Sequence, residues 1–327
     1  MSVLMHLSDL HFGAHDPRVC AAVQALARAL PVSVVVVSGD LTQRATVPQF
    51  AAAHAFIAAL PARHTLVMPG NHDLPLFAWW ERIGGAYRRY ARWWGDDREP
   101  VCDAGGFFVV GVDTTRPWRH SQASLSGAQI DRAARRLAGA LRPRVQDGDA
   151  GPVVLLGYSV GGVLALLTAL QPGLPVAGVV AGNTGAHSSR HGDPGFARRV
   201  REGWTAEARR DFLRTCFART PPAMLFAQLC AYLDSLAPEA LLQSIEGLRA
   251  VDLRPLLPSL RGPVLVLHGE RDMRRSVADA EELAACLPSA QLRLLPGGHT
   301  PMVDCLPQYL QALHPFLAAL AHQPAQA

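Results

Sequence analysis

The chain has 327 residues, of which 49% are hydrophobic and 18% charged, so it can bury a large core and global disorder is excluded. Its formal net charge is only +4, and because the sequence contains no lysine, all 31 of its cationic side chains are arginines. A charge this small does not favour a nucleic-acid partner, and none is expected.

The first 150 residues alternate apolar, strand-like runs with helical patterns. Residues 32–37 are five valines and one serine, which is typical of a strand buried on both faces of a parallel sheet. The alternation of strands with helices predicts an α/β fold. In this half we expect strands at 3–7, 32–37, 65–68 and 107–112, and helices at 19–30, 49–60 and 126–141, the last with Ser126 as its N-cap.

The second half continues the alternation and contains a long insertion. Residues 185–255 have mainly helical patterns with proline breaks, and they separate two of the expected strands. Strands are expected at 153–156, 176–180, 264–267 and 292–295, and helices at 162–170 and 307–321, the last interrupted near Pro315.

Cysteine usage and the N-terminus bear on the location of the protein. The six cysteines form no Cys-x-x-Cys pair, which favours reduced thiols over a zinc or redox site. No basic segment followed by a long apolar run opens the chain, so we expect no signal peptide. Residues 151–189 carry no charge, but glycines and prolines interrupt them, which is typical of buried strands and helices rather than a membrane span. A cytoplasmic protein without a membrane partner is expected, and its oligomeric state stays open.

Three polar clusters each follow an expected strand of the first half. They are Asp9-x-His11, Gly39-Asp40 and Gly70-Asn71-His72-Asp73. Because the loops after the carboxyl ends of parallel strands converge, these side chains are expected to meet. Asp, His and Asn supply the oxygen and nitrogen ligands that Mn, Fe or Zn accept. The pattern predicts a divalent metal site.

These clusters resemble the calcineurin-like metallophosphoesterase family, over roughly residues 1–150. The matching segments are SDLHFG (8–13), VVVSGDLT (35–42), MPGNHD (68–73) and VVGVDTT (109–115). The resemblance implies that Asp9 and His11 bind a first ion, that Asp40 bridges, that Asn71 binds a second ion, and that His72 is an acid or a phosphate contact. The family's later Gly-His-x-His motif is absent, so we expect at most one tightly held ion and phosphodiesterase activity that is weak or absent.

A second set of residues points to nucleophilic catalysis. An expected strand leads into Gly157-Tyr-Ser159-Val-Gly161-Gly162, a Gly-x-Ser-x-Gly turn that opens an apolar helix. Ser159 is the candidate nucleophile, and the Val160 backbone N–H is a candidate oxyanion donor. Asp272 and His299 follow later strands in the order acid, then histidine. Glu270 is the alternative acid, and His268 is expected to be structural.

Residues 152–321 resemble the back half of the α/β-hydrolase carboxylesterases, close to the pimeloyl-ACP methyl ester esterase group. Much of the resemblance lies in VDLRPLLPSLRGPVLVLHGERD (251–272) and LRLLPGGHTPM (292–302). It implies a Ser-Asp-His catalytic triad that needs no cofactor, and a helical cap at about 185–255. Trp204, Phe212, Phe217 and Leu225 are candidates to line an acyl pocket or simply to pack the cap. The family's early strands are absent, and with them the loop that supplies its second oxyanion donor.

Together the two resemblances predict a chimera-like α/β chain. A metallophosphoesterase half-sandwich (1–150) is joined near residues 151–157 to the C-terminal half of an α/β-hydrolase sheet with its cap (151–327). The first functional hypothesis is a serine hydrolase that acts on a small carboxylic ester. The second is a metal-dependent phosphoesterase that acts on a small phosphoester. The third is a fusion in which neither site is competent.

Overall fold

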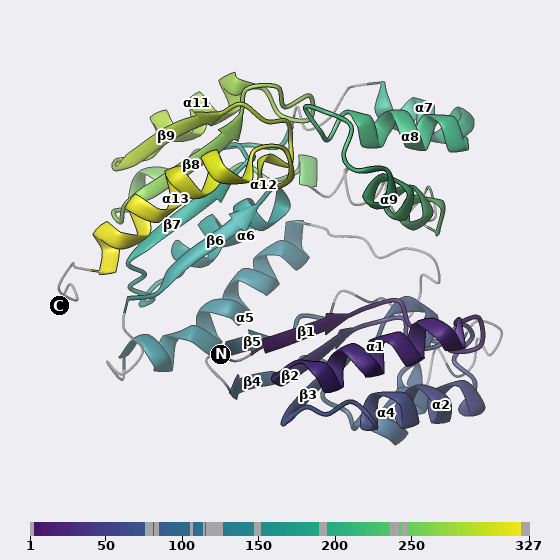
Figure 1. Cartoon of the computed structure of the whole chain (residues 1–327). Helices are drawn as coiled ribbons and strands as arrows, with labels where there is room; N and C mark the ends of the chain where they lie inside the picture. Colours follow the sequence, from purple (N-terminus) through teal and green to yellow (C-terminus); the bar gives the residue numbers. More distant parts are fainter. Residues whose placement is uncertain are drawn as a thin grey trace. The chain divides into compact units, whose positions relative to one another are not determined.

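A computed structural model describes residues 3–75, 81, 85–104, 107–113, 115, 127–146, 152–189, 195–235, 238, 242 and 248–321. The chain divides into two compact units, Met1–Ser124 and Leu125–Ala327 (Figure 1). The boundary predicted at residue 150, which lies outside the described residues, is one helix further along the chain than this division. Helix α5 (Gly127–Gln146), expected in the first half, belongs to the second unit and packs on α6 (Val160–Ala169). Ser126, its expected N-cap, also lies outside the described residues.

The first unit contains a parallel sheet in the order β1-β2-β3. Valine side chains alternate across its central strand. Val35 and Val37 belong to the core under the helices, whereas Val34 and Val36 pack against an antiparallel hairpin, so β2 is buried on both faces. The elements are β1 (Val3–Leu7), α1 (Pro17–Ala29), β2 (Val32–Ser38), α2 (Val47–Ala58), β3 (His64–Met68), α4 (Arg88–Trp94), β4 (Val101–Ala104) and β5 (Phe107–Val110).

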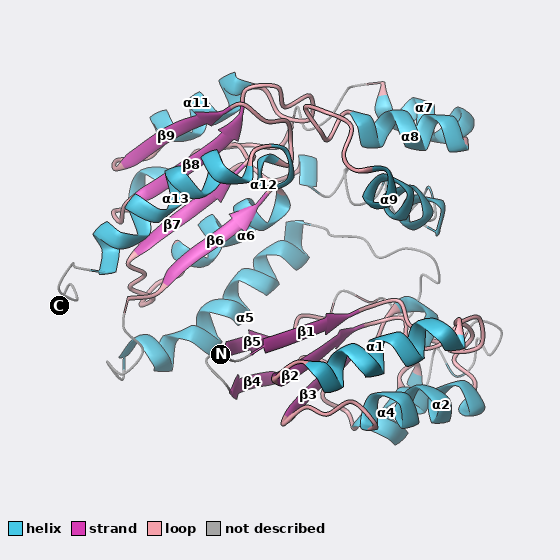
Figure 2. Cartoon of the chain, viewed as in Figure 1, coloured by secondary structure: helices cyan, strands magenta, loops and turns pink. Residues whose placement is uncertain are grey.

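The second unit contains a four-stranded parallel sheet in the order β6-β7-β8-β9 (Figure 2). Its strands present alternate residues to two cores. Val264 and Val266 face the core that α6 and α11 contribute to, and Leu265 and Leu267 face α13. The bounds are β6 (Val154–Tyr158), β7 (Gly178–Gly182), β8 (Val264–Gly269), α11 (Val277–Cys286), β9 (Ala290–Leu295), α12 (Pro301–Asp304) and α13 (Leu306–Ala321).

The insertion between β7 and β8 is helical where it is described, as expected. It contains α7 (Phe196–Gly203), α8 (Ala206–Arg214) and α9 (Ala223–Ser235). These helices lie beyond the carboxyl ends of the strands, at the edge toward which the arrows of β6–β9 point (Figure 1). Parts of the predicted cap, including residues 190–194, lie outside the described residues.

The structure corrects one expectation about a helix and adds elements that were not predicted. Helix α13 runs through Pro315 without interruption, because Leu313, Phe316 and Leu320 are all buried on the sheet and hold both sides of the proline in place. Helices α4 and α11 and strand β4 were not expected. Among the described residues, no helix is long and apolar enough to cross a membrane.

Candidate active site

Ser159 occupies a strained turn between β6 and α6. Its φ of 53° and ψ of −117° lie outside the regions that L-residues favour. The turn needs glycine beside it, because a Cβ on Gly157 would lie 2.0 Å from the Gly161 carbonyl oxygen. A hydrogen bond from the Ser159 N–H to the Gly182 carbonyl (2.8 Å) ties the turn to β7. This is the geometry of a nucleophile elbow, as the Gly-x-Ser-x-Gly motif predicted.

The structure brings Ser159, His299 and Asp272 together, although they are distant in sequence. His299 Nε2 lies 3.1 Å from Ser159 Oγ, and His299 Nδ1 lies 2.8 Å from Asp272 Oδ2. A carboxylate can only accept hydrogen bonds, so Nδ1 carries the proton that is donated to Asp272. In the neutral imidazole Nε2 is then the acceptor, and the Ser159 hydroxyl donates to it.

Asp272 is held by a full set of donors. Its side chain is 0% exposed, and its Oδ1 accepts the backbone N–H groups of Arg274 (2.7 Å) and Arg275 (2.9 Å). Burial raises the pKa of this carboxyl, but hydrogen bonds from His299, Asn183 and Arg275 outweigh burial and hold the pKa below its usual value. Asp272 is therefore ionised. Glu270, the alternative acid, is exposed at the start of the turn that follows β8.

His268 is placed as a structural residue, as expected. Its side chain is 0% exposed, and its Nε2 donates to the Arg275 carbonyl at 3.2 Å. Burial lowers the pKa of this imidazole and keeps it neutral beside Asp272.

The Val160 N–H lies at the start of α6, immediately after the elbow. Val160 is the first residue of the helix, and N–H groups in a first helical turn have no intrahelical acceptor. The positive end of the helix dipole is at the same place. A negatively charged oxygen next to Ser159 would be stabilised there.

Hydrogen bonds attach the inserted block to the loop that carries His299. Thr300 donates from both its N–H (3.2 Å) and its Oγ1 (2.9 Å) to the Cys216 carbonyl. The Asp304 carboxylate accepts the N–H groups of Gly298 (2.7 Å) and Ala218 (2.9 Å). The Arg274 guanidinium lies 4.6 Å from the centre of the Phe212 ring. The block is thus fixed to both the acid loop and the histidine loop.

The four candidate pocket residues differ in their surroundings. Trp204 and Phe212 pack against Phe196 in a cluster of the block itself. Phe217 is buried, and its backbone lies directly against Gly298, where an added Cβ would meet the Phe217 carbonyl carbon at 2.7 Å. Leu225 is half-buried on α9. Phe217 is therefore the candidate that lies beside the histidine loop.

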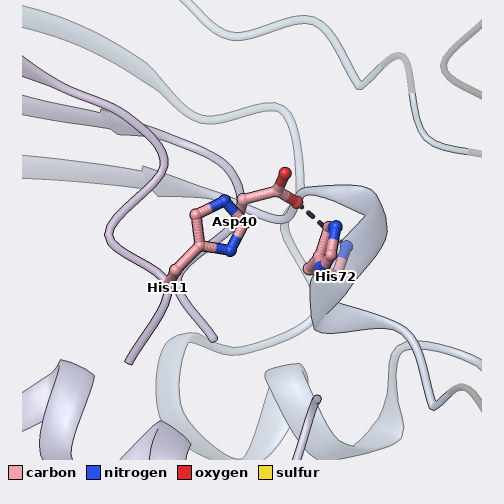
Figure 3. A group of neighbouring side chains, drawn as sticks. All are labelled: His11, Asp40 and His72. Carbon is pink, nitrogen blue, oxygen red and sulfur yellow. Dashed lines mark hydrogen bonds between the residues drawn. The ribbon is translucent and has the colours of Figure 1, made fainter. Parts of the chain in front are cut away.

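In the first unit, two of the predicted metal ligands, His11 and Asp40, come together with His72 in the loops that follow β1, β2 and β3. Donor atoms of His11, Asp40 and His72 all lie within 4.8 Å of one another, with the Asp40 carboxylate between the two rings in the view of Figure 3. Asp9 Oδ1 lies 3.7 Å from His11 Nε2. Asn71 begins the short helical turn that carries His72. His72, expected as an acid or phosphate contact, brings its ring into the cluster itself.

Three residues of this cluster have strained backbone conformations, and the buried Asp73 carboxylate joins two of the loops that carry the cluster. Asp9, His11 and Asp40 all have positive φ, between 44° and 56°. Asp73 is fully buried and accepts hydrogen bonds from the N–H groups of Gly70 (2.8 Å) and Thr42 (2.9 Å), which joins the second and third loops. Burial raises the pKa of Asp73 to about 7, against the effect of these hydrogen bonds. The His72 N–H donates to Asp40 Oδ1 at 2.9 Å.

The donor set fits a divalent cation. His11 Nδ1 is buried and has no hydrogen-bond partner within the described part of the chain. His72 Nδ1 lies 3.1 Å from the Gln43 carbonyl, so Nδ1 carries the proton and Nε2 is left with its lone pair, as in a metal-binding histidine. Burial raises the pKa of Asp40, and a cation bound beside this carboxylate would act in the opposite direction by favouring its ionised form. Two imidazoles and a carboxylate suit Zn, Mn or Fe.

A second group of similar donors has a structural explanation. His187, Asp279 and Glu282 lie close together in the second unit. His187 Nε2 pairs with Glu282 at 3.1 Å, and Asp279 forms the capping box of α11 with Ser276. These groups satisfy one another without a metal ion.

Two family models match this chain, one in its N-terminal part and one in its C-terminal part. Residues 111–311, more than half of the chain, match the family model described as alpha/beta hydrolase family, and residues 2–132 match the model of the calcineurin-like phosphoesterases. The chain therefore belongs to the alpha/beta hydrolase family and is an esterase-like hydrolase, with a calcineurin-like phosphoesterase segment at its N-terminus. Both predicted resemblances and the predicted α/β fold are confirmed.

Two individual relatives and one solved structure are similar to this chain. A pimeloyl-[acyl-carrier protein] methyl ester esterase of Xanthomonas oryzae pv. oryzae is 31% identical over 183 residues, which cover 52% of this chain and 72% of the relative. Polyketide synthase ThaQ of Burkholderia thailandensis is 36% identical over 46% of this chain and 8% of its own length. The solved structure of a thermophilic esterase superposes with a TM-score of 0.51 at 20% identity, over 66% of this chain and 81% of that one, which supports the fold.

Two residues near the candidate triad were missed in the sequence. Asn183, directly after β7, contacts Asp272, and Asp304 in α12 holds the histidine loop. Asn183 could have been noticed because it is a polar residue at the carboxyl end of a buried strand of this sheet. Asp304 had no such signal, because an acidic residue in a short helix is common.

Proposed function

We propose that the chain is a serine hydrolase of small carboxylic esters, with Ser159 as nucleophile, His299 as general base and acid, and Asp272 as the orienting carboxylate. The observation that carries the proposal is the continuous path of contacts, 3.1 Å and then 2.8 Å, from Ser159 Oγ through both ring nitrogens of His299 to Asp272. No cofactor is needed for this reaction.

In the first half-reaction Ser159 Oγ attacks the ester carbonyl carbon, and the hydroxyl proton passes to His299 Nε2. The tetrahedral intermediate collapses, the carbon–oxygen bond to the alcohol breaks, and the alcohol leaves with the proton from His299. A water molecule then attacks the acyl-enzyme, gives its proton to His299, and the acid is released as Ser159 regains a proton. Asp272 stays ionised and stabilises the imidazolium formed in each step.

The Val160 N–H is proposed to bind the oxyanion, with help from the α6 dipole. One donor fewer than the usual two costs about 10²- to 10³-fold in rate. We therefore expect slow turnover unless a donor outside the described residues replaces the one that the early strands of the family supply.

The proposed substrate class is a small ester with an apolar acyl chain. The Xanthomonas relatives are named for the methyl ester of a pimeloyl group carried by acyl-carrier protein. In this chain Phe217 is an apolar residue of the inserted block beside the histidine loop, where an acyl chain would be contacted.

The test is covalent labelling together with turnover. The full chain should hydrolyse p-nitrophenyl acetate and react with a fluorophosphonate at Ser159, and the Ser159→Ala variant should lose both. Ester hydrolysis by Ser159→Ala within a few-fold of the parent would refute the proposal. Ser189→Ala, a hydroxyl that hydrogen-bonds His187 instead, is the matched control.

A second function, metal-dependent phosphoester hydrolysis, is favoured by the His11–Asp40–His72 cluster and the buried, unpartnered Nδ1 of His11. Asp9, His11, Asp40, Asn71 and His72 would hold a divalent ion, which when bound supplies Lewis-acid polarisation of a phosphate and of a water. The ligands that the family supplies later in its sequence have no counterpart motif here, so one ion is expected rather than two.

This second function is tested with bis-p-nitrophenyl phosphate and with metal analysis of protein purified without chelator. We expect at most one Mn, Fe or Zn per chain and phosphodiesterase turnover that is weak or absent. Two tightly bound ions with robust, EDTA-sensitive turnover would contradict the expectation and make phosphoester hydrolysis the principal activity.

A further inference from the structure

Asn183 lies where three strands of the hydrolase sheet end, and the reaction steps proposed above give it no role. It follows β7 directly, is 0% exposed, and has a φ of 47°. Its backbone N–H donates to the Leu267 carbonyl at 2.8 Å, which fixes the residue beside the end of β8. A positive φ is unusual for a residue with a side chain, but asparagine tolerates it better than most.

The Asn183 side chain joins the acid loop to the histidine loop. Its Nδ2 donates to Asp272 Oδ2 at 2.8 Å and to the Gly298 carbonyl, next to His299, at 3.2 Å. Both partners are acceptors, so the opposite orientation of the amide would place its oxygen against a carboxylate and a carbonyl. The orientation is therefore determined by the contacts.

The same orientation leaves the amide oxygen of Asn183 without a hydrogen-bond donor in the described part of the chain. Asn183 Oδ1 is buried and has no hydrogen-bond partner within the described residues. A buried acceptor without a partner destabilises a fold, and a residue in a strained backbone conformation does so as well. Both features are typical of a site where a functional contact is retained at the expense of stability.

From this geometry we infer that Asn183 is a positioning residue for the triad, and this inference depends on the proposed serine-hydrolase function. One N–H of its amide fixes the Asp272 carboxylate that His299 needs, and the other fixes the backbone on which His299 is carried. By sharing the charge of Asp272 Oδ2, the amide also weakens the attraction of that carboxylate for a protonated His299.

The other titratable and charged groups around Asp272 and His299 are compatible with this role of Asn183. Asp272 and His299 are also surrounded by titratable or charged side chains from β6, the β8 turn, α12 and the inserted block, namely Tyr158, His268, Arg274, Arg275, Cys216 and Asp304. Burial lowers the pKa of His268 and raises that of Cys216, so both stay neutral near pH 7. Asp272 Oδ2 accepts hydrogen bonds from the Asn183 amide and from the His299 ring.

The experiment compares Asn183→Gly with Thr184→Val in the full chain. Glycine adopts the positive φ without strain, and the substitution removes the side chain that carries the amide. Thr184 is the next residue, is equally buried, and has a hydroxyl without a partner in the described structure, so valine removes a polar group that does not touch the triad. Thermal unfolding of each variant establishes that it is folded.

For Asn183→Gly we expect kcat on p-nitrophenyl acetate to fall about 10- to 100-fold, with KM nearly unchanged, because the reacting groups are less well aligned. The acid limb of the pH profile of kcat/KM should move to higher pH, because Asp272 then holds a protonated His299 more strongly. Thr184→Val should match the parent in kcat and in the position of the acid limb. Asn183→Asp should retain activity at the acid end of the range, where its protonated carboxyl still donates to Asp272, and lose it as the carboxyl ionises.

A readout that does not need turnover is the NMR signal of the His299 Nδ1 proton, whose titration midpoint reports the pKa of the imidazole. A midpoint that is higher in Asn183→Gly than in the parent supports the inference, and equal midpoints overturn it. If the parent is active and Asn183→Gly shows the same kcat and the same acid limb, positioning by Asn183 is refuted while the proposed function stands. If the parent neither turns over esters nor labels at Ser159, the proposed function fails, and the NMR comparison alone decides the role of Asn183.

Discussion

Replacing Asp272 with asparagine tests the geometry of the candidate triad most directly. The carboxylate accepts two hydrogen bonds on each oxygen, from Arg274 N and Arg275 N on Oδ1 and from His299 Nδ1 and Asn183 Nδ2 on Oδ2. An amide has only one acceptor oxygen. If this oxygen keeps the two backbone N–H groups, the new NH₂ faces two donors.

His299 can form a hydrogen bond with the new NH₂ group only in its other tautomer. Its Nδ1 then accepts from the new amide, and its proton moves to Nε2, which faces Ser159 Oγ. A protonated Nε2 cannot remove the hydroxyl proton, so kcat should fall by the order of 10⁴-fold, the loss found for this change in a serine protease triad, with KM little affected. The Asn183 N–H that donated to Asp272 Oδ2 is then left without an acceptor, which should lower the free energy of unfolding by about 1–3 kcal/mol.

The pH dependence of stability gives an independent check of the same change. The folded-state pKa of Asp272 is lower than its usual value because hydrogen bonds overcome burial, so ionised Asp272 stabilises the fold. This contribution is fully present above the pKa of the unfolded chain, about 3.9, and is lost as the pH falls through the lower folded pKa. Asp272→Asn should therefore be less stable than the parent at neutral pH, and this difference should shrink in acid.

The assay is hydrolysis of p-nitrophenyl acetate together with fluorophosphonate labelling, and unfolding is followed from neutral pH downward. Asp252→Asn is the control, because Asp252 is an exposed carboxylate paired with Arg254. If Asp272→Asn kept its activity within about 10-fold of the parent, the tautomer argument would be wrong. Glu270→Gln would then be the variant to examine as the alternative acid.

Three further outcomes are expected. Gly157→Ala should greatly lower the unfolding temperature, since its Cβ would lie 2.0 Å from the Gly161 carbonyl, whereas Gly161→Ala, with nothing within 4 Å, should unfold near the parent temperature. Asp304→Ala, which leaves the Gly298 N–H without its acceptor, should lower kcat by about 10-fold or more through a displaced histidine loop, and unchanged kinetics would show that Asp304 does not position that loop. His11→Ala should abolish metal retention in elemental analysis while His15→Ala retains it, and equal metal content in both variants would exclude His11 as a ligand.

Much of the site could be predicted because its residues stand at the carboxyl ends of strands that are easy to recognise. The valines of β2 and the apolar run before Gly157 mark buried strands, and a parallel sheet brings the loops that follow them to one edge. The order of Ser159, Asp272 and His299 then suffices to predict their meeting. The metal cluster follows for the same reason from β1, β2 and β3.

What escaped prediction depends on contacts between distant segments. An Asn after a strand is usually a turn residue, and only the position of Asp272 gives Asn183 its significance. Whether Pro315 would interrupt α13 depended on the burial of its neighbours against the sheet. Helix α4 is only seven residues long and contains three arginines and two tryptophans, so no helical apolar pattern marks it in the sequence. It is held by Tyr90, whose hydroxyl donates to the Val67 carbonyl at 2.8 Å.

The strand order carries a consequence for how the chain is synthesised. In every sheet of the described structure, the hydrogen-bonded strands are consecutive in the chain. Each strand leaving the ribosome therefore finds its partner already present, and the first unit can be complete before β6 is made. β8 also finds its partner β7 already made, but it must join β7 across the whole inserted block, and closing that long connection carries an entropic cost that shorter connections avoid. The rate-limiting step of folding is therefore expected at the joining of β7 and β8, after which Asp272 and His299 reach Ser159 together.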